Sequence, residues 1–383
     1  MALTHAEKTA IGLELKDQLW GTPYACTSLT IVSGGTANFL YRGVLAQTLP
    51  DGERTIVVKH AREFVSANRG FALDVSRCSY EVNMLNALAA FQVGLKDRVR
   101  IRTPRLYHFD RSTSTQIIED LSNSVSMTEA LVSNAPFTAG PTALGKVMGT
   151  WIRRFHCWTA DVNQKPLRRL VYDNSAMRKI RYDISYGAFT TILKKFPDIW
   201  EAKGHILDEV KSMATAEYAK VPDDESDMLW GLIHGDFWTG NVLMPSSNDG
   251  EPLEGIIELF IIDWEMAQYG RIEYDLGQMI GDMYERKVFA KAENALPLIQ
   301  GFLSGYGALS DEEAFRVAIH AGQHLVCWYI RRDPNSSLTG IEDQVGEAMR
   351  IGSDFIVNGW ARDRDWFAST DLACLFDIAT KSQ

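Results

Sequence analysis

The spacing of apolar residues divides the chain into a strand-rich N-terminal part and a helix-rich remainder. Residues 3–20 have apolar positions three and four apart, which predicts a leading helix. A period of two follows, and it predicts strands over residues 29–32, 39–44, 54–60, 104–110 and 115–121. A helical stripe over residues 76–91 separates the third strand from the fourth. We therefore expect a small antiparallel sheet with one helix inserted in its sequence.

The rest of the chain has mainly helical spacing, and two helix starts carry a capping signature. Ser126 and Glu129 match the capping box, in which each side chain bonds the backbone amide of the other. Ser310 and Glu313 repeat this pattern further on. Within this mainly helical part, three short apolar runs predict strands over residues 229–233, 242–244 and 255–262.

Length and composition are those of an ordinary globular protein. With 383 residues, of which 46% are hydrophobic and 23% charged, the chain can bury a large core, and its length favours two lobes. We place an N-terminal lobe over residues 1–120 and a helical lobe over residues 121–383. The N-terminus lacks the basic and apolar regions of a signal peptide, and no segment is apolar for long enough to span a bilayer. We expect a cytoplasmic protein with no membrane partner.

The charge and the cysteines argue against several classes of protein. A formal net charge of -10 disfavours nucleic acid as a partner, because a phosphate backbone is normally met by a basic face. An acidic surface is compatible with an amine-bearing substrate. The 5 cysteines are scattered, without CxxC or Cys/His pairing, so neither a disulfide framework nor a zinc site is predicted. We therefore expect the protein to be in a reducing compartment.

The most informative polar residues lie between and after the later strands. In the segment HGDFWTGN, Asp236 is followed five residues on by Asn241, and Asp263 ends the next strand. Metal-assisted phosphoryl transfer uses such a set. One carboxylate takes the proton of the acceptor hydroxyl, while a carboxamide and a second carboxylate hold Mg²⁺ against the nucleotide phosphates. We predict Asp236 as the base and Asn241 and Asp263 as metal ligands; the alternative is a set of turn residues that cap strands.

The N-terminal hairpin offers a candidate phosphate site. Its turn contains Gly34 and Gly35, which let backbone N–H groups approach phosphate oxygens. Lys59 closes the next strand, from which its ammonium can reach the phosphates over the turn, and Glu81 on the following helix is the candidate to hold it. The simpler alternatives are an ordinary glycine turn, a lysine at a sheet edge facing water, and a solvated glutamate.

Further residues are candidates for contacts around these groups. The chain crosses between the lobes near Glu119, Asp120 and Leu121, whose backbone groups could pair with an adenine edge. We call the segment HGDFWTGN the catalytic loop. Asp275, near the start of a later helix, is expected to brace this loop, because a carboxylate there can accept backbone hydrogen bonds. Asp282 lies seven residues further, on a similar helix face, and could meet a substrate amine; core packing or a solvated face is the alternative.

The order of these parts resembles the aminoglycoside phosphotransferase and choline kinase superfamily, which has a bilobal protein-kinase-like fold of the α+β class. The resemblance covers residues 28–281, with the glycine hairpin, the VVK strand, the helix glutamate, the IIEDL crossover, HGDFWTGN and IIDWE in order. HGDFWTGN is similar to the segment of fructosamine kinases and related fungal small-molecule kinases. The later DWE and YG segments are similar to those of methylthioribose and hydroxytryptamine kinases. We expect a small antiparallel-sheet N-lobe and a larger, mostly helical C-lobe.

The resemblance also implies cofactors and roles. It implies ATP and Mg²⁺ as cofactors. It also implies Asp236 as the base, Asn241 and Asp263 as metal ligands, and Lys59 as the lysine that binds the phosphates. It adds Asn38 in the loop over the nucleotide and Glu265 as a group that assists a second metal or the substrate. The chain has no HRD, DFG or APE segment, so a peptide acceptor is disfavoured.

The sequence therefore predicts an enzyme: an ATP- and Mg²⁺-dependent kinase that phosphorylates a hydroxyl group of a small, amine-bearing molecule. Two alternatives stay open, a nucleotide-binding pseudokinase without phosphotransfer and nucleotidyl transfer on the same fold. The base and both metal ligands are present, whereas pseudoenzymes usually lose one of them, and this favours the kinase.

Overall fold

The computed structural model describes residues 3–32, 35, 37–220, 229–246, 255–332 and 336–376. It separates into two compact units. The smaller comprises Met1–Gln92 and Arg102–Asn123, and the larger comprises Val93–Ile101 and Ser124–Gln383. Within the described residues, no helix is long and apolar enough to cross a membrane.

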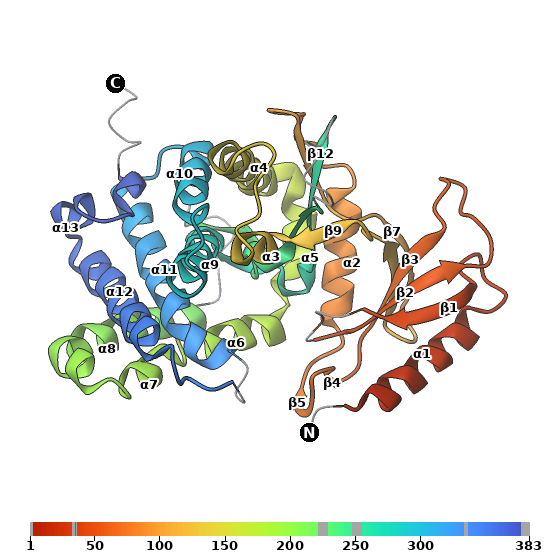
Figure 1. Ribbon diagram of the computed structural model, residues 1–383, viewed down its shortest axis with the longest axis horizontal. Helices are drawn as coiled ribbons and strands as arrows, with labels where there is room; N and C mark the ends of the chain where they lie inside the picture. The colour runs from red at the N-terminus through yellow and green to blue at the C-terminus, as the bar shows by residue number, and fades with distance from the viewer. Residues whose placement is uncertain are drawn as a thin grey trace. The chain divides into compact units, whose positions relative to one another are not determined.

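The smaller unit is built on an antiparallel sheet of five strands in the order β1-β2-β3-β8-β7. The strands are β1 (Cys26–Ile31), β2 (Phe39–Leu45), β3 (Thr55–His60), β7 (Leu106–Asp110) and β8 (Thr115–Glu119), and β4 (Phe64–Val65) pairs with β5 (Asn68–Ala72) beside them. Burial alternates along β2, as the period of two requires. Helix α1 (His5–Leu19) packs against β1 and closes the core over Tyr41, Ile56 and Val58 (Figure 1).

Helix α2 (Arg77–Leu88) follows the β4–β5 hairpin, where the sequence predicted a helix. Its buried face includes Met84, Leu85 and Leu88 together with Glu81. The smaller unit thus has the predicted small antiparallel sheet with one inserted helix.

The larger unit is mostly helical and contains two small sheets. Its helices are α3 (Met127–Val132), α4 (Pro141–Ala160), α5 (Lys165–Tyr172), α6 (Ser175–Ile184), α7 (Phe189–Leu193), α8 (Pro197–Ala219), α9 (Glu273–Ala290), α10 (Ala295–Tyr306), α11 (Asp311–Arg331), α12 (Glu342–Ala361) and α13 (Arg364–Ala368). Helix α11 packs against both α9 and α12 (Figure 1). The capping boxes predicted at Ser126 and Ser310 are confirmed at the starts of α3 and α11.

The strands of the larger unit flank the segment HGDFWTGN, residues 234–241. They form a pair, β10 (Trp230–Ile233) with β13 (Gln268–Arg271), and a sheet in the order β6-β12-β11-β9, with β6 (Val99–Arg102), β9 (Ser124–Ser126), β11 (Val242–Pro245) and β12 (Ile257–Ile261). The three strands predicted over residues 229–262 are β10, β11 and β12. The α+β class and its division into a sheet unit and a helical unit are confirmed.

Glycines let α4 and α10 approach until their backbones touch. A Cβ added at Gly145 or Gly149 of α4 would meet backbone atoms of α10, and one added at Gly301 or Gly305 of α10 would meet backbone atoms of α4. At each of these glycines, an added methyl group would overlap main-chain atoms of the other helix. A change of side-chain rotamer could therefore not relieve the overlap. The two helices can pack in this way only with glycine at these positions.

Gly149→Ala is expected to destabilise the larger unit, because the new methyl group meets the Phe302 carbonyl oxygen. We expect a loss of about 3 kcal/mol, at the upper end of what overpacking costs, in urea unfolding followed by circular dichroism. Gly346→Ala is the matched control. Gly346 lies within α12, and a methyl group added there would have no neighbour within 4 Å, so its replacement should be neutral or stabilising by about 1 kcal/mol. Equal losses for the two variants would contradict the argument.

Candidate active site

The loop after β10 turns sharply at Gly235. Its φ of +82° lies in the left-handed region, and a Cβ there would collide with the Met266 carbonyl oxygen. The His234 side chain also holds the loop, through hydrogen bonds of both ring nitrogens. Its Nδ1 accepts from the Asp236 N–H at 3.2 Å, so its Nε2 carries the proton and donates to the Ile262 carbonyl oxygen at 3.0 Å. The turn is thereby tied to the end of β12.

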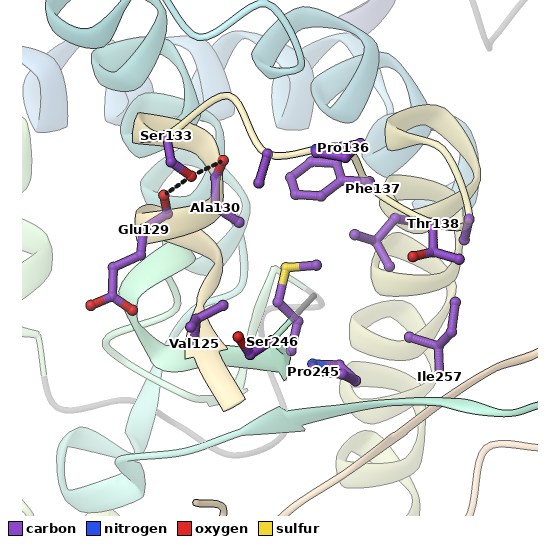
Figure 2. Close-up of a pocket in the computed structure, with 14 residues that line it drawn as sticks. Val125, Glu129, Ala130, Ser133, Pro136, Phe137, Thr138, Pro245, Ser246 and Ile257 are labelled. Carbon is purple, nitrogen blue, oxygen red and sulfur yellow. Dashed lines mark hydrogen bonds between the residues drawn. The ribbon is translucent and has the colours of Figure 1, made fainter. Parts of the chain in front are cut away.

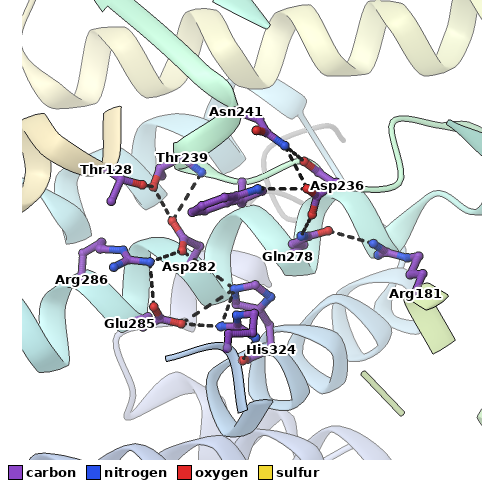
Figure 3. Close-up of polar contacts among 12 residues, drawn as sticks. Thr128, Arg181, Asp236, Thr239, Asn241, Gln278, Asp282, Glu285, Arg286 and His324 are labelled. Carbon is purple, nitrogen blue, oxygen red and sulfur yellow. Dashed lines mark hydrogen bonds and ion pairs between the residues drawn. The ribbon is translucent and has the colours of Figure 1, made fainter. Parts of the chain in front are cut away.

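The Asp236 carboxylate accepts hydrogen bonds from three side chains (Figure 3). Oδ1 accepts from Gln278 Nε2 at 2.7 Å. Oδ2 accepts from Asn241 Nδ2 at 3.0 Å and from Trp238 Nε1 at 3.2 Å. Burial, followed by the negative charge of Asp263, raises the pKa of Asp236. The group predicted as the base is thus both held in place and made more basic.

Asn241 and Asp263 lie at the same end of the β11–β12 pair, with Asn241 just before β11 and Asp263 just after β12. Asn241 uses its amide nitrogen for Asp236, so its Oδ1 is the atom that can bind a cation. Its backbone carbonyl oxygen accepts from the Ile262 N–H at 3.0 Å, which ties the Asn241 segment to the residue before Asp263. Asp263 has a φ of +65°, which is uncommon for a residue other than glycine and typical of functional sites.

The turn after Asp263 is held by a residue from far away in the sequence. Asn174 is 1% exposed and donates through Nδ2 to the carbonyl oxygens of Glu265 and Ala267, at 3.0 and 2.9 Å. Glu265 is itself buried, at 4% exposure. The Asn174 amide thus sets the path of the chain where Asp263 and Glu265 leave β12.

Asp275 braces the catalytic loop, as predicted. Its two carboxylate oxygens accept from the backbone N–H groups of His234 at 2.8 Å and Gly235 at 3.0 Å. Burial opposes its ionisation, but the hydrogen bond with His156 and the positive charge of Arg181 outweigh burial and hold the pKa of Asp275 below its usual value. The carboxylate stays ionised beneath the loop.

Asp282, two turns further along α9, also faces the loop (Figure 3). It is 1% exposed, accepts from the Thr239 hydroxyl and N–H, and pairs with Arg286 at 2.7 Å. Glu285 pairs with Arg286 and with Arg331, so two guanidinium groups balance two buried carboxylates. These contacts hold Asp282 within the larger unit, and its predicted contact with a substrate amine stays a prediction.

In the smaller unit, Lys59 and Glu81 form a buried ion pair. Lys59 Nζ donates to Glu81 at 2.8 Å, and the two residues are 6% and 3% exposed. Gln116, opposite Lys59 in the β3–β8 register, donates to the second Glu81 oxygen at 2.8 Å. Lys59 therefore lies on a central strand rather than at a sheet edge, and Glu81 is not solvated.

The glycine turn is described only in part. Gly34 lies outside the described residues, and Gly35 accepts through its carbonyl oxygen from Ser66 Oγ at 3.3 Å. Asn38 is 5% exposed, and its Oδ1 accepts from Arg77 at 2.9 Å. The end of the turn is thereby connected to the start of α2, the helix that carries Glu81.

The crossover residues are occupied by contacts within the smaller unit. Glu119 accepts from both Nη atoms of Arg102, at 2.6 and 2.7 Å, and its N–H donates to the Arg105 carbonyl oxygen at 2.9 Å. Asp120 accepts from Arg42 Nε at 2.8 Å. Leu121 follows directly. The predicted pairing of this segment with an adenine edge stays a prediction.

Sequence analysis missed four residues of the site: Gln278, Arg181, Asn174 and Gln116. Gln278 has a signal, because it lies three residues after Asp275 and therefore on the same helix face. Arg181 and Asn174 come from a helical stretch without a motif, and Gln116 is an ordinary strand position. Nothing in one sequence connects these three with the site.

A pocket of about 440 Å³ lies elsewhere in the larger unit, between α3, the segment before α4, and β11 (Figure 2). Its lining is mainly apolar and includes Phe137, Leu144, Met244 and Ile257. Glu129 at its rim is engaged in the capping box of α3. None of the predicted site residues that the structure describes lines this pocket.

The model of the phosphotransferase enzyme family matches residues 52–316, and the chain belongs to this family. The predictions of the superfamily, of the bilobal fold and of a small-molecule kinase are confirmed.

Individual relatives extend over most of the chain. The phosphotransferase FrzJ of Cladobotryum sp is 31% identical, over 98% of this chain and 99% of that protein. The 4-hydroxytryptamine kinase of Psilocybe cyanescens is 24% identical, over 78% of this chain and 79% of that protein. Among solved structures, a choline/ethanolamine kinase family protein from Mesorhizobium loti matches with a TM-score of 0.49 at 14% identity, over 96% of this chain and 99% of that one.

Asp275→Asn should weaken the loop, because an amide replaces one of two oxygens that face N–H donors. We expect a loss of about 1.5–3 kcal/mol at pH 7, measured by urea unfolding. The folded-state pKa of Asp275 is lowered, so its contribution is present above the unfolded-state pKa of about 4 and is lost as the pH falls through the folded-state value. The difference between wild type and variant should therefore shrink below about pH 4.

The control for this experiment is Asp208→Asn, at an exposed position of α8. It should leave the unfolding free energy within about 0.5 kcal/mol of wild type. A loss for Asp275→Asn that stayed constant down to pH 3 would contradict the assignment of an ionised brace.

Proposed function

We propose that the protein transfers the γ-phosphoryl group of ATP to a hydroxyl group of a small molecule, with Mg²⁺ as cofactor. The observation that carries this proposal is the Asp236 carboxylate, oriented by three donors and followed by Asn241 and Asp263. Nucleotide binding is assigned to the smaller unit and acceptor binding to the helical unit.

In the reaction, the acceptor hydroxyl donates its proton to Asp236 as its oxygen forms a bond to the γ-phosphorus. The bond between that phosphorus and the bridging oxygen breaks, and ADP leaves with the bridging oxygen. The raised pKa of Asp236 suits it to take this proton, because a general base works best when its pKa approaches the working pH.

The residues present fit a magnesium ion. Asn241 Oδ1 and the Asp263 carboxylate are the hard oxygen ligands that Mg²⁺ prefers. The charge of Asp263 raises the pKa of Asp236, so a cation between these groups would relieve the repulsion. When bound, the ion neutralises negative charge on the nucleotide phosphates. Glu265, two residues after Asp263, is a further candidate ligand.

The ion pair of Lys59 and Glu81 supports nucleotide binding. Gln116 and Lys59 occupy the two oxygens of Glu81, which holds the ammonium in one position. A lysine fixed in this way on a central strand is suited to the phosphates of ATP. Gly35 and Asn38, at the hairpin turn, are assigned to the loop that covers them.

The acceptor is proposed to be an amine-bearing alcohol. The formal net charge of -10 favours a cationic substrate, and one relative is named a 4-hydroxytryptamine kinase. The 5 cysteines are free, in keeping with a reaction in the reducing cytoplasm.

Asp236→Asn should lower kcat by about 10³-fold and leave ATP affinity nearly unchanged, because the amide cannot take a proton while the phosphate ligands stay in place. The measurement is ADP release with choline, ethanolamine, hydroxytryptamines, methylthioribose, fructosamines and aminoglycosides, alongside ATP binding by calorimetry. Asp208→Asn should behave as wild type. Full activity in Asp236→Asn would overturn the role of Asp236, and release of pyrophosphate instead of ADP would indicate nucleotidyl transfer.

Asp263→Asn should raise the Mg²⁺ concentration needed for half-maximal turnover by about tenfold or more, because one anionic ligand becomes neutral. Chelation with EDTA should abolish turnover in both proteins, and added Mg²⁺ should restore it. An unchanged Mg²⁺ requirement in the variant would remove Asp263 from the metal site.

A further inference from the structure

Four lone-pair positions are available on the Asp236 carboxylate, two on each oxygen. Within the described part of the chain, Trp238 and Asn241 occupy both positions on Oδ2. Gln278 occupies one position on Oδ1, through the shortest of the three bonds at 2.7 Å. The remaining position is on Oδ1. The acceptor hydroxyl can therefore approach only one of the two oxygens without displacing a protein donor.

The direction of the Gln278 amide is set by Arg181. A glutamine side chain has a donor end and an acceptor end, and either could face Asp236. Arg181 has donors only, and its Nη1 bonds Gln278 Oε1 at 2.9 Å. The oxygen of the amide must therefore face Arg181, and the NH₂ group must face Asp236 (Figure 3).

Arg181 is itself fixed by several contacts. It is 7% exposed, its Nη1 also donates to the Gly235 carbonyl oxygen, and its Nη2 bonds His320 Nε2 at 3.1 Å. Because Arg181 can only donate, His320 Nε2 is the acceptor and Nδ1 carries the proton, which it donates to the Tyr186 hydroxyl at 3.1 Å. The direction of every hydrogen bond from Tyr186 to Asp236 is thus determined.

We propose that Arg181 and Gln278 are positioning residues that act as a directed relay, presenting Oδ1 of Asp236 as the atom that takes the acceptor proton. The assignment rests on the proposed function, because it specifies which atom of the base reacts. Gln278 does not touch the substrate. It acts by fixing the carboxylate plane, and Arg181 acts by preventing the Gln278 amide from turning over.

The test compares Gln278→Leu with Gln278→Glu. Leucine removes both bonds, whereas glutamate keeps an acceptor toward Arg181 and replaces the donor toward Asp236 by an oxygen. A relay predicts that both variants lose about 10²-fold in kcat, with an unchanged KM for ATP. A purely structural role predicts instead that kcat falls only in a variant whose melting temperature also falls. Gln323→Leu, a buried glutamine of α11, is the matched control and should keep wild-type kcat.

A second measurement does not depend on turnover. The Trp238 indole N–H donates to Asp236, so its resonance in ¹⁵N-tryptophan-labelled protein reports the position of the carboxylate. The resonance is assigned by its disappearance in Trp238→Phe. Both Gln278 variants should shift it, and Gln323→Leu should not. An unmoved resonance, or wild-type kcat in Gln278→Glu, would overturn the relay, whereas a wild-type protein inactive with every acceptor would overturn only the proposed function.

Discussion

The candidate active site depends on one face of helix α9. Asp275, Gln278 and Asp282 follow one another at helical spacing, and each is hydrogen-bonded to a different part of the catalytic loop. All three are buried, and a buried polar group without a partner costs free energy. Helix and loop are therefore stable only when docked against each other in this register. The helix supplies hydrogen-bond partners to the loop at three successive points.

This dependence explains why the helix must itself be rigid. Helix α9 packs along α11, where Gly277 and Gly281 bring the two backbones close together. Gly277 and Gly281 thus lie along α9 between Asp275 and Asp282, the first and last of the residues that face the loop. On the other side of the loop, His234 packs against Trp264 with ring centroids 4.3 Å apart, and Trp264 contacts Phe155 of α4. Packing on both sides holds the hydrogen-bond donors and acceptors of the loop in a fixed arrangement.

The parts of the molecule that sequence analysis could predict are those with a local signal. The strands β2 and β3 have apolar residues at strand spacing, α3 and α11 have capping boxes, and Asp236 and Asn241 are separated by a characteristic interval. The position of Asp275 at the start of a helix was also sufficient to predict its role as a brace. Arg181, Asn174 and Gln116 could not be found, because their contacts cross long intervals of sequence. Arg181 meets Gln278 across 97 residues, and Asn174 meets Glu265 across 91. For Asp282 the sequence indicated the helix face, and its contacts with Thr239 and Arg286 could not be predicted from one sequence.

The occupied lone pairs of Asp236 have a consequence for the competition between water and an acceptor hydroxyl. With three positions held by the protein, a water molecule and an acceptor hydroxyl compete for the same fourth position and cannot both be activated. Under the proposed function, an acceptor hydroxyl bound at this position would displace a water molecule from it. The hydrogen bonds of a single carboxylate would thereby limit proton removal to one hydroxyl-bearing molecule at a time.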